Sequence, residues 1–152
     1  MTTTAPAPTG VHAGIDPRGP QLTAGITAVV LVAVLLLPSP WAAALTAVQA
    51  VLFAIGVSRG VQHTPHAWLF RTVVRPRLAP PAELEDPVPP RFAQGVGAVF
   101  AGTALVAFLL GSTTVGEIAI ALALVAATLN AVFRLCLGCE LYLLFKRSTT
   151  AH

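Results

Sequence analysis

The chain has 152 residues, of which 55% are hydrophobic and only 10% are charged, and its formal net charge is +3. A soluble domain carries roughly 25% charged residues, and a chain of this length has too little polar surface to cover so much apolar sequence, so the composition favours a membrane protein. The basic residues are few, and no Lys or Arg cluster is interleaved with aromatic residues in the manner of a nucleic-acid-binding surface, so we expect no nucleic-acid partner.

The first twenty residues, MTTTAPAPTGVHAGIDPRGP, are rich in Thr, Ala, Pro and Gly. They contain nothing that could bury a core, so we predict a disordered N-terminal tail over residues 1–20. A cleaved signal peptide is the alternative, with Leu22 to Leu37 as its apolar stretch. The start has no basic cluster and the apolar run continues almost unbroken beyond this stretch, which favours a retained helix.

Four apolar windows follow, and they predict membrane-crossing helices at about residues 22–37, 41–57, 92–111 and 116–145. At 1.5 Å per residue, the first three are about 24 to 30 Å long, which is close to the thickness of a bilayer's hydrocarbon core. Pro38 and Pro40 separate the first two windows, which therefore form a helical hairpin. We predict an all-α fold: a transmembrane bundle of four helices in two hairpins, forming one domain over residues 21–147, with a C-terminal tail at 148–152.

The last apolar window is too long for a single crossing. From Gly116 to Phe145 it would extend about 45 Å as a helix, which exceeds the hydrocarbon core by something like 15 Å. Arg134 lies within this window, and its long side chain reaches the headgroups if the membrane boundary is nearby. The piece from Leu135 to Phe145 then emerges, bends at Gly138 or lies along the membrane surface.

The connection at residues 58–91 has two parts. In the first, apolar residues around Trp68 alternate with Arg71, Arg75 and Arg77, a pattern that suits a segment lying on the surface of an anionic membrane. The second, LAPPAELEDPVPPR, contains five prolines and three acidic residues. It predicts a stiff extended strap and not a helix.

The basic residues also predict topology. They occur before the first helix, in the 58–91 connection and after the fourth helix, whereas the two short connections contain no Lys or Arg. The positive-inside rule therefore places both termini and the connection in the cytoplasm, so we expect a multi-pass protein of the inner (plasma) membrane.

Small and polar residues inside the apolar windows predict how the helices pack. Gly97-x-x-x-Ala101 and Ala98-x-x-x-Gly102 have the spacing that allows close approach of two helices, although alanine is common throughout the chain. Gln49 and Asn130 carry amides at membrane depth. Such amides usually hydrogen-bond to another helix, so we expect them to hold helices together and not to line a pathway.

The chain's two cysteines, Cys136 and Cys139, are its strongest candidates for chemistry. Residues three apart share a helix face, so the two sulfurs could bridge or hold one ligand. A helix N-terminus and Arg134 would favour thiolate, and Glu140 could accept a proton. On the predicted cytoplasmic side, which is reducing, a permanent structural disulfide is not expected. The alternative is that both cysteines simply pack.

A metal site is a further option, because His63 and His66 are expected on the same face as the cysteines. Two thiolates and two imidazoles would make a tetrahedral zinc set. A proline lies between the histidines and there is no second cysteine pair, so ordinary surface histidines are favoured. We expect no metal and no other cofactor.

The stretches DPRGPQLTAGITAVVL, RPRLAPPAELEDPVPPRFAQGVG and CLGCELYLL together resemble the domain of unknown function 4395 family of small bacterial, mostly actinobacterial, integral membrane proteins. The resemblance covers about Ile15 to Leu144, and its most specific parts are Pro89 to Gln94 and the cysteine pair. The family has no settled activity. Its members are often encoded near thioredoxin-fold or sulfurtransferase proteins, so the resemblance implies such a partner in addition to the lipid bilayer.

Two hypotheses of function follow. The first is a thiol-disulfide or sulfane-sulfur exchange partner, with Cys136 and Cys139 as the reactive pair and with Arg134 and Glu140 in supporting roles. The second is a non-enzymatic membrane subunit or small transporter whose cysteines are structural. The sequence does not decide whether the protein is an enzyme.

Overall fold

The computed structural model describes residues 14–150, which are mainly helical and contain no strand beyond one isolated β-bridge. The α-helices are α1 (Arg18–Leu36), α2 (Ser39–Arg59), α3 (Pro65–Leu69), α4 (Val88–Leu109), α5 (Thr113–Phe133) and α6 (Leu137–Thr150). Between α3 and α4 the chain adds a π turn, η2 (Phe70–Val74), and a 3-10 turn, η3 (Arg75–Arg77), and another 3-10 turn, η1 (Val61–His63), follows α2. The predicted all-α fold is confirmed.

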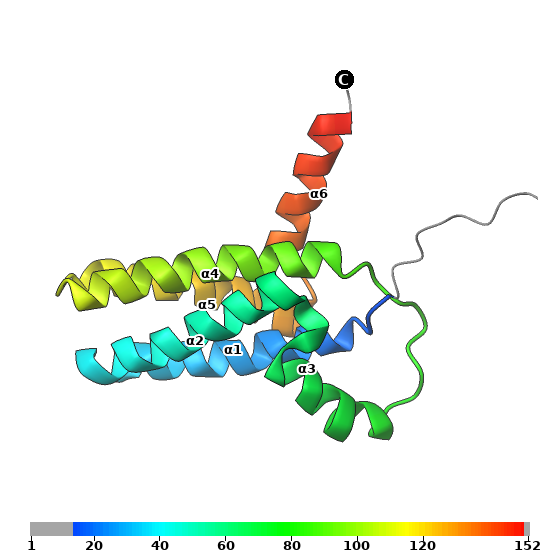
Figure 1. Cartoon of the computed structure of the whole chain (residues 1–152), viewed down its shortest axis with the longest axis horizontal. Coiled ribbons are helices and arrows are strands. Elements are labelled where there is room, and N and C mark those ends of the chain that lie inside the picture. The colour runs from blue at the N-terminus through cyan, green and yellow to red at the C-terminus, as the bar shows by residue number, and fades with distance from the viewer. Residues whose placement is uncertain (1–13, 151–152) are drawn as a thin grey trace, which may run out of the picture.

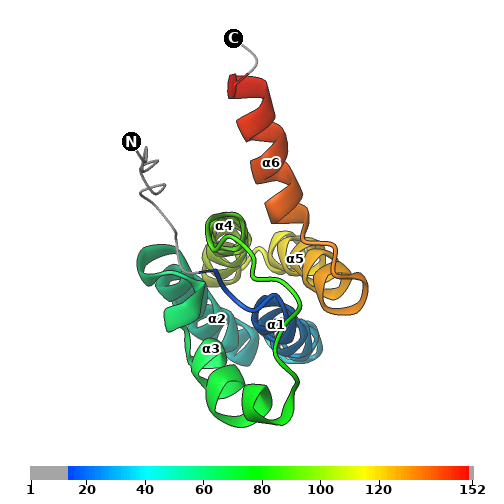
Figure 2. The same ribbon diagram turned by 90° about the vertical axis from the view of Figure 1, so that its right-hand side faces the viewer.

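Four helices, α1, α2, α4 and α5, are long and apolar enough to cross a membrane, with mean hydropathies between 1.8 and 2.0. They form a four-helix bundle in which α1 contacts α2 and α5, and α4 contacts the same two helices (Figures 1 and 2). Only 22% to 33% of each span is buried inside the protein. Since the remaining apolar surface faces outward, the fold is that of a multi-pass membrane protein.

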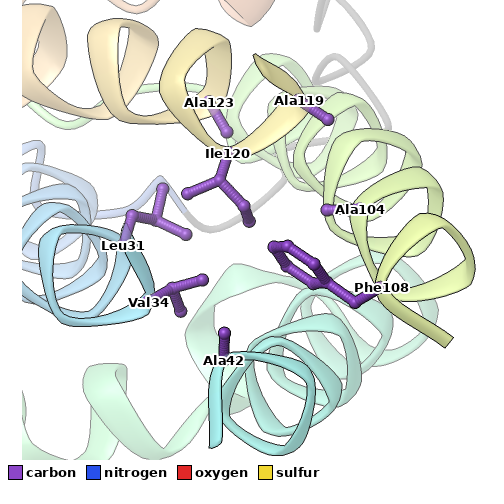
Figure 3. Close-up of a cluster of buried hydrophobic side chains, with 8 residues drawn as sticks. All are labelled: Leu31, Val34, Ala42, Ala104, Phe108, Ala119, Ile120 and Ala123. Atoms are coloured by element: carbon purple, nitrogen blue, oxygen red, sulfur yellow. The ribbon is translucent and has the colours of Figure 1, made fainter. Parts of the chain in front are cut away.

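The core lies where the four helices meet. Leu31 of α1 and Ile120 of α5 are fully buried at its centre, and the ring of Phe108 from α4 packs beside them (Figure 3). The rest of the cluster consists of Val34, Ala42, Ala104, Ala119 and Ala123. Alanines on the facing helices leave room for the few large side chains, which is how helices pack closely in a bilayer.

One of the two small-residue pairs lies in a helix interface. A β-carbon on Gly97 would stand 2.7 Å from the ring of Phe53 on α2, and Ala101 is only 1% exposed. Gly102, by contrast, has nothing within 4 Å of the position that a β-carbon would take. Gly97 therefore marks a close approach of α4 to α2, and Gly56 marks another, because a β-carbon on Gly56 would stand 2.8 Å from the Gln94 side chain.

The two amides do not form the interhelical hydrogen bonds that the sequence predicted. Gln49 is 1% exposed, but its Oε1 accepts no hydrogen bond, and the Asn130 side chain makes none within residues 14–150. Other side chains join the helices: Gln21 Nε2 of α1 donates to the Ala131 carbonyl of α5 at 2.9 Å, and Arg91 of α4 donates to the Val57 and Ser58 carbonyls of α2.

Part of the predicted N-terminal tail is ordered, so that prediction is wrong for residues 14–20, while residues 1–13 lie outside the described residues. Ile15 pairs with Glu85 through two backbone hydrogen bonds of 2.9 Å, and Asp16 pairs with Arg18 at 2.7 Å. Helix α1 accordingly begins at Arg18 and not at residue 22.

The predicted strap is shorter than residues 78–91, because α4 begins at Val88. Pro89 and Pro90 occupy its first turn, where a proline loses no helical hydrogen bond. Asp86 Oδ1 accepts the Val88 N–H at 2.9 Å. At the other end of the chain, α6 continues to Thr150, so a C-terminal tail from residue 148 is also wrong as far as the described residues extend.

The predicted helix over residues 116–145, whose continuity the sequence leaves open, is divided into two helices, α5 and α6. Arg134 adopts a left-handed conformation with φ of 57°, and its N–H and that of Leu135 donate to the carbonyls of Asn130 and Leu129 at 3.1 and 3.2 Å. These are the hydrogen bonds of a helix C-terminus that closes with a left-handed residue. The chain therefore turns at Arg134, before Gly138, and α6 leaves the bundle at a steep angle (Figure 1).

Candidate functional site

One end of the bundle gathers the polar and reactive features of the chain. The start of α1, the end of α2, α3, the start of α4, the end of α5 and α6 all lie there (Figures 1 and 2). All nine Lys and Arg residues belong to these segments, to the turns η2 and η3 that follow α3, or to the connection between α5 and α6, namely Arg18, Arg59, Arg71, Arg75, Arg77, Arg91, Arg134, Lys146 and Arg147. We call this end the basic end. The opposite end carries only the two short turns, which contain no basic residue.

Cys136 and Cys139 lie at this end, at disulfide-bonding distance. Their Cα atoms are 5.1 Å apart, and the two sulfurs are bonded. Cys136 precedes the first residue of α6, and Cys139 is the third residue of that helix. The sequence prediction that the spacing brings the two sulfurs together is confirmed.

The start of α6 gives the two cysteines different surroundings. The Cys136 sulfur accepts the backbone N–H of Cys139 at 3.3 Å, and the Cys136 carbonyl accepts the N–H of Glu140 at 3.0 Å. Cys136 is thus the N-terminal cap of α6, and its sulfur occupies the place where free N–H groups and the helix dipole stabilise negative charge. Cys139 lies one turn further on, within the helix.

Contacts with α4 hold the first turns of α6. Gly138 is buried, and a β-carbon on it would stand 2.6 Å from both Cα and Cβ of Ala93. One turn later, the rings of Tyr142 and Phe92 lie 5.7 Å apart at a tilt of 49°. Both contacts fix the cysteine pair beside the N-terminal end of α4.

The sulfur pair is neither sealed in the core nor fully open. Cys136 and Cys139 are both half-buried, and their neighbours Leu135 and Leu137 are 41% and 38% exposed. Beyond the pair, Leu141, Leu144 and Phe145 form an exposed apolar stripe along α6. A helix with such a stripe, leaving a bundle sideways, has the form of one that lies in a membrane interface.

The predicted supporting residues lie close in sequence but are not joined to the sulfurs. Arg134 and Glu140 are exposed, and neither side chain forms a hydrogen bond or ion pair within residues 14–150. Arg134 acts through its backbone, which makes the turn into α6. Stabilisation of a thiolate by Arg134 and proton transfer by Glu140 stay predictions.

The histidines form no metal set with the cysteines. Within residues 14–150, no group of three or more His, Cys, Asp and Glu side chains is placed to hold a metal ion. The His63 Nδ1–H donates to the Arg59 carbonyl at 2.7 Å, an arrangement that serves the turn after α2. His66 is half-buried, and this burial lowers the pKa of its imidazole.

Two features of the site escape sequence reasoning. The contact between Gly138 and Ala93 depends on where α6 crosses α4, and nothing in the local sequence around Ala93 signals it. The groove formed by α2 and α3 is the other, because its basic residues come from both sides of a turn that the sequence pattern does not resolve.

Comparison with known proteins gives one match. No curated protein and no solved structure matches the chain. The family model described as "Domain of unknown function (DUF4395)" matches residues 15–147, which include all four membrane spans and the cysteine pair. The chain therefore belongs to the DUF4395 family, as its sequence resemblance predicted.

Proposed function

We propose that this protein is a membrane-bound partner in thiol-disulfide or sulfane-sulfur exchange, with Cys136 and Cys139 as the reactive pair. The observation that carries the proposal is the pair at disulfide-bonding distance, with Cys136 capping α6. A purely structural cysteine has no need of a partner three residues away or of a helix N-terminus, whereas an exchange site uses both.

The geometry assigns the two sulfurs different roles. In the reduced pair, the Cys136 thiolate is stabilised by the Cys139 N–H and by the N-terminus of α6, so Cys136 is the attacking sulfur. Cys139 lies near enough to attack it in turn and is the resolving residue. Arg134, next to the pair in sequence, adds positive charge, and Glu140 is the nearest carboxylate along the chain for taking up the Cys139 proton.

The exchange proceeds in two displacements. The Cys136 thiolate attacks one sulfur of the partner's disulfide, forming a mixed disulfide and releasing the partner's first thiolate. Cys139, deprotonated, then attacks the Cys136 sulfur and releases the partner's second thiolate. The partner gains two electrons and becomes a dithiol, and the protein is left with the Cys136–Cys139 disulfide.

The same two cysteines can also take up sulfane sulfur from a carrier. The Cys136 thiolate attacks the terminal sulfur of a carrier persulfide, and the carrier thiolate leaves. Cys139 then attacks the Cys136 sulfur and expels hydrosulfide, again leaving the disulfide. A thioredoxin-fold protein or a sulfurtransferase is the class of partner that this chemistry fits.

We also propose that the basic end faces the cytoplasm, which places both termini there in the inner (plasma) membrane. The collection of all nine basic residues at one end supports this orientation, because positively charged segments are retained on the cytoplasmic side. The exposed apolar stripe on α6 supports a position of the cysteine pair at the membrane surface.

The experiment is a reaction of the reduced protein in detergent with dithiodipyridine, an aromatic disulfide that releases thiopyridone on attack. The wild-type protein should release two thiopyridones per chain as it re-forms its disulfide. Cys139→Ser should release one at a similar rate and keep a stable mixed disulfide, whereas Cys136→Ser should react much more slowly. Equal rates in the two variants, or a reaction only after denaturation, would exclude the proposed roles.

A further inference from the structure

An open groove lies at the basic end, on the side of the bundle where α2 runs into α3. It has a volume of about 710 Å³, and the residues that matter in its lining are Ile55, Arg59, His63, Thr64, Trp68 and Arg71. None of these belongs to the cysteine site, and the exchange chemistry proposed above does not use them.

The groove is positively charged and has no countercharge. Arg59 and Arg71 are both exposed, and within residues 14–150 the one ion pair is that of Arg18 with Asp16. No Asp or Glu is part of the lining. Two unpaired guanidinium groups on one groove provide the planar, multiple N–H donors that suit the oxygens of a phosphate.

The turn that carries these residues is held by its own hydrogen bonds. Thr64 is buried, and its Oγ1 donates to the Val61 carbonyl at 3.0 Å and accepts the Ala67 N–H at 3.2 Å. The His63 Nδ1–H donates to the Arg59 carbonyl at 2.7 Å, so the ring is tied to the end of α2. The groove is therefore shaped before any ligand arrives, which reduces the ordering cost of binding.

The groove has an apolar side toward the membrane span of α2 and a polar side that carries the arginines. Ile55 belongs to the last turns of α2, an apolar span, and Trp68 is 60% exposed on α3 just beyond that span. Tryptophan is enriched where a membrane meets water, and basic pockets beside spans bind anionic headgroups. A ligand here meets apolar side chains toward the bilayer and arginines toward the water.

We propose that this groove binds the phosphate-bearing headgroup of an anionic phospholipid, with Arg59 and Arg71 contacting the phosphate and Trp68 and Ile55 contacting the glycerol and upper acyl chains. The positive charge of the groove favours a phosphate-bearing ligand. Its position at the end of the α2 span, where the membrane meets water, favours a lipid over a soluble phosphate compound. The consequence is a specific lipid that holds α3 against α2 at the basic end.

Competition quenching tests this site directly. The chain has two tryptophans, and Trp41 lies at the opposite end of α2, so the Trp41→Phe variant leaves Trp68 as the single reporter. The variant is reconstituted with mixtures of brominated phosphatidylglycerol and unbrominated phosphatidylcholine. The fluorescence of Trp68 should then be quenched more strongly than the bulk ratio of the two lipids predicts. Arg59→Gln/Arg71→Gln should weaken this preference by about tenfold or more, since the charge-assisted hydrogen bonds from both guanidinium groups to the phosphate are lost.

The charge-matched control is Arg77→Gln/Arg147→Gln, which removes two exposed arginines outside the groove and should leave most of the preference in place. A conservative Arg59→Lys/Arg71→Lys variant should retain part of it, which separates loss of binding from misfolding. Equal loss in both glutamine doubles would mean general surface attraction and would overturn the site. Loss of the preference in excess inorganic phosphate, but not in chloride of equal ionic strength, would mean a soluble phosphate ligand and would overturn the lipid.

Discussion

Gly138 at the start of α6 lies directly against Ala93 of α4, so that a β-carbon on Gly138 would stand 2.6 Å from the Ala93 Cα. The neighbour is backbone and cannot move aside as a flexible side chain would. The close crossing of these two helices is what holds the cysteine pair beside the bundle.

Replacement of Gly138 by alanine should therefore destabilise the docking of α6. Alanine is about 1 kcal/mol better than glycine in an isolated helix, so propensity alone predicts stabilisation. We expect the clash with Ala93 to outweigh this gain, lowering the thermal unfolding midpoint and speeding the reaction of the reduced cysteines with dithiodipyridine. Gly102→Ala is the matched control, because nothing lies within 4 Å of its β-carbon position. A higher midpoint in Gly138→Ala would contradict the crossing.

The aromatic contact between Tyr142 and Phe92 should contribute independently to the same docking. Tyr142→Ala should cost about 0.5 to 1.5 kcal/mol of unfolding free energy beyond the loss of buried area, whereas Tyr142→Phe should be nearly neutral because it keeps the ring. A double-mutant cycle with Phe92→Ala measures the coupling. A coupling free energy of zero would show that the two rings lie close without stabilising α6.

Much of the fold follows from the sequence because hydropathy and length act over whole helices. Four apolar windows and two proline or glycine breaks are enough to predict two hairpins, and α2, for example, begins within two residues of its expected start. The ends of the helices and of the N-terminal segment were predicted less well than the helices themselves. At Val88, prolines read as a strap in fact form the first turn of a helix, and at residues 14–20 order comes from pairing with Glu85, a contact distant in the sequence.

The site was predictable only in part, for a related reason. The spacing of Cys136 and Cys139 is local, and it correctly indicated that their sulfurs meet. The break at Arg134 depends on a left-handed residue, which is rarely an arginine, so the sequence left open where the last apolar window divides. The contact of Gly138 with Ala93 and the groove beside α3 depend on how distant helices pack against each other. No local sequence pattern predicts either of them.

A pH dependence should arise where Asp16 binds Arg18, the residue that contacts the strap. Hydrogen bonds from Arg18 lower the Asp16 pKa below its ordinary value of 3.8, and Arg18 also donates to the Ala79 carbonyl at 2.9 Å. Since the folded pKa is the lower one, the stabilisation is complete above the unfolded value and is lost as the pH falls through 3.8 toward the folded pKa.

Thermal unfolding in detergent from neutral pH down to about pH 3 should therefore show a steeper loss of stability for the wild type than for Asp16→Asn. The difference should be modest, because Arg18 is partly exposed and the pair is screened by solvent. Glu83→Gln, which alters an exposed acid of the strap, serves as the control and should keep the wild-type slope. Identical slopes in all three proteins would exclude the Asp16 contact as the source.

Arg91 should stabilise the junction of α2 and α4. Its Nε donates to the Val57 carbonyl at 2.5 Å and its Nη2 to the Ser58 carbonyl at 3.2 Å, so it satisfies carbonyls that the end of α2 leaves free. Arg91→Gln should lower the unfolding free energy by about 1 kcal/mol, while Arg75→Gln, an exposed arginine with no such bonds, should have little effect. Equal effects would assign the loss to net charge instead.

We propose that Cys136 and Cys139 are a reactive pair at the cytoplasmic surface of the membrane. Labelling with a membrane-impermeant maleimide, in right-side-out and inverted vesicles and before and after mild reduction, tests orientation and reactivity together. We expect the wild type to be labelled only in inverted vesicles and only after reduction, and the single-cysteine variants to be labelled faster at Cys136 than at Cys139. Labelling from the outer face, or none until detergent unfolds the bundle, would contradict it.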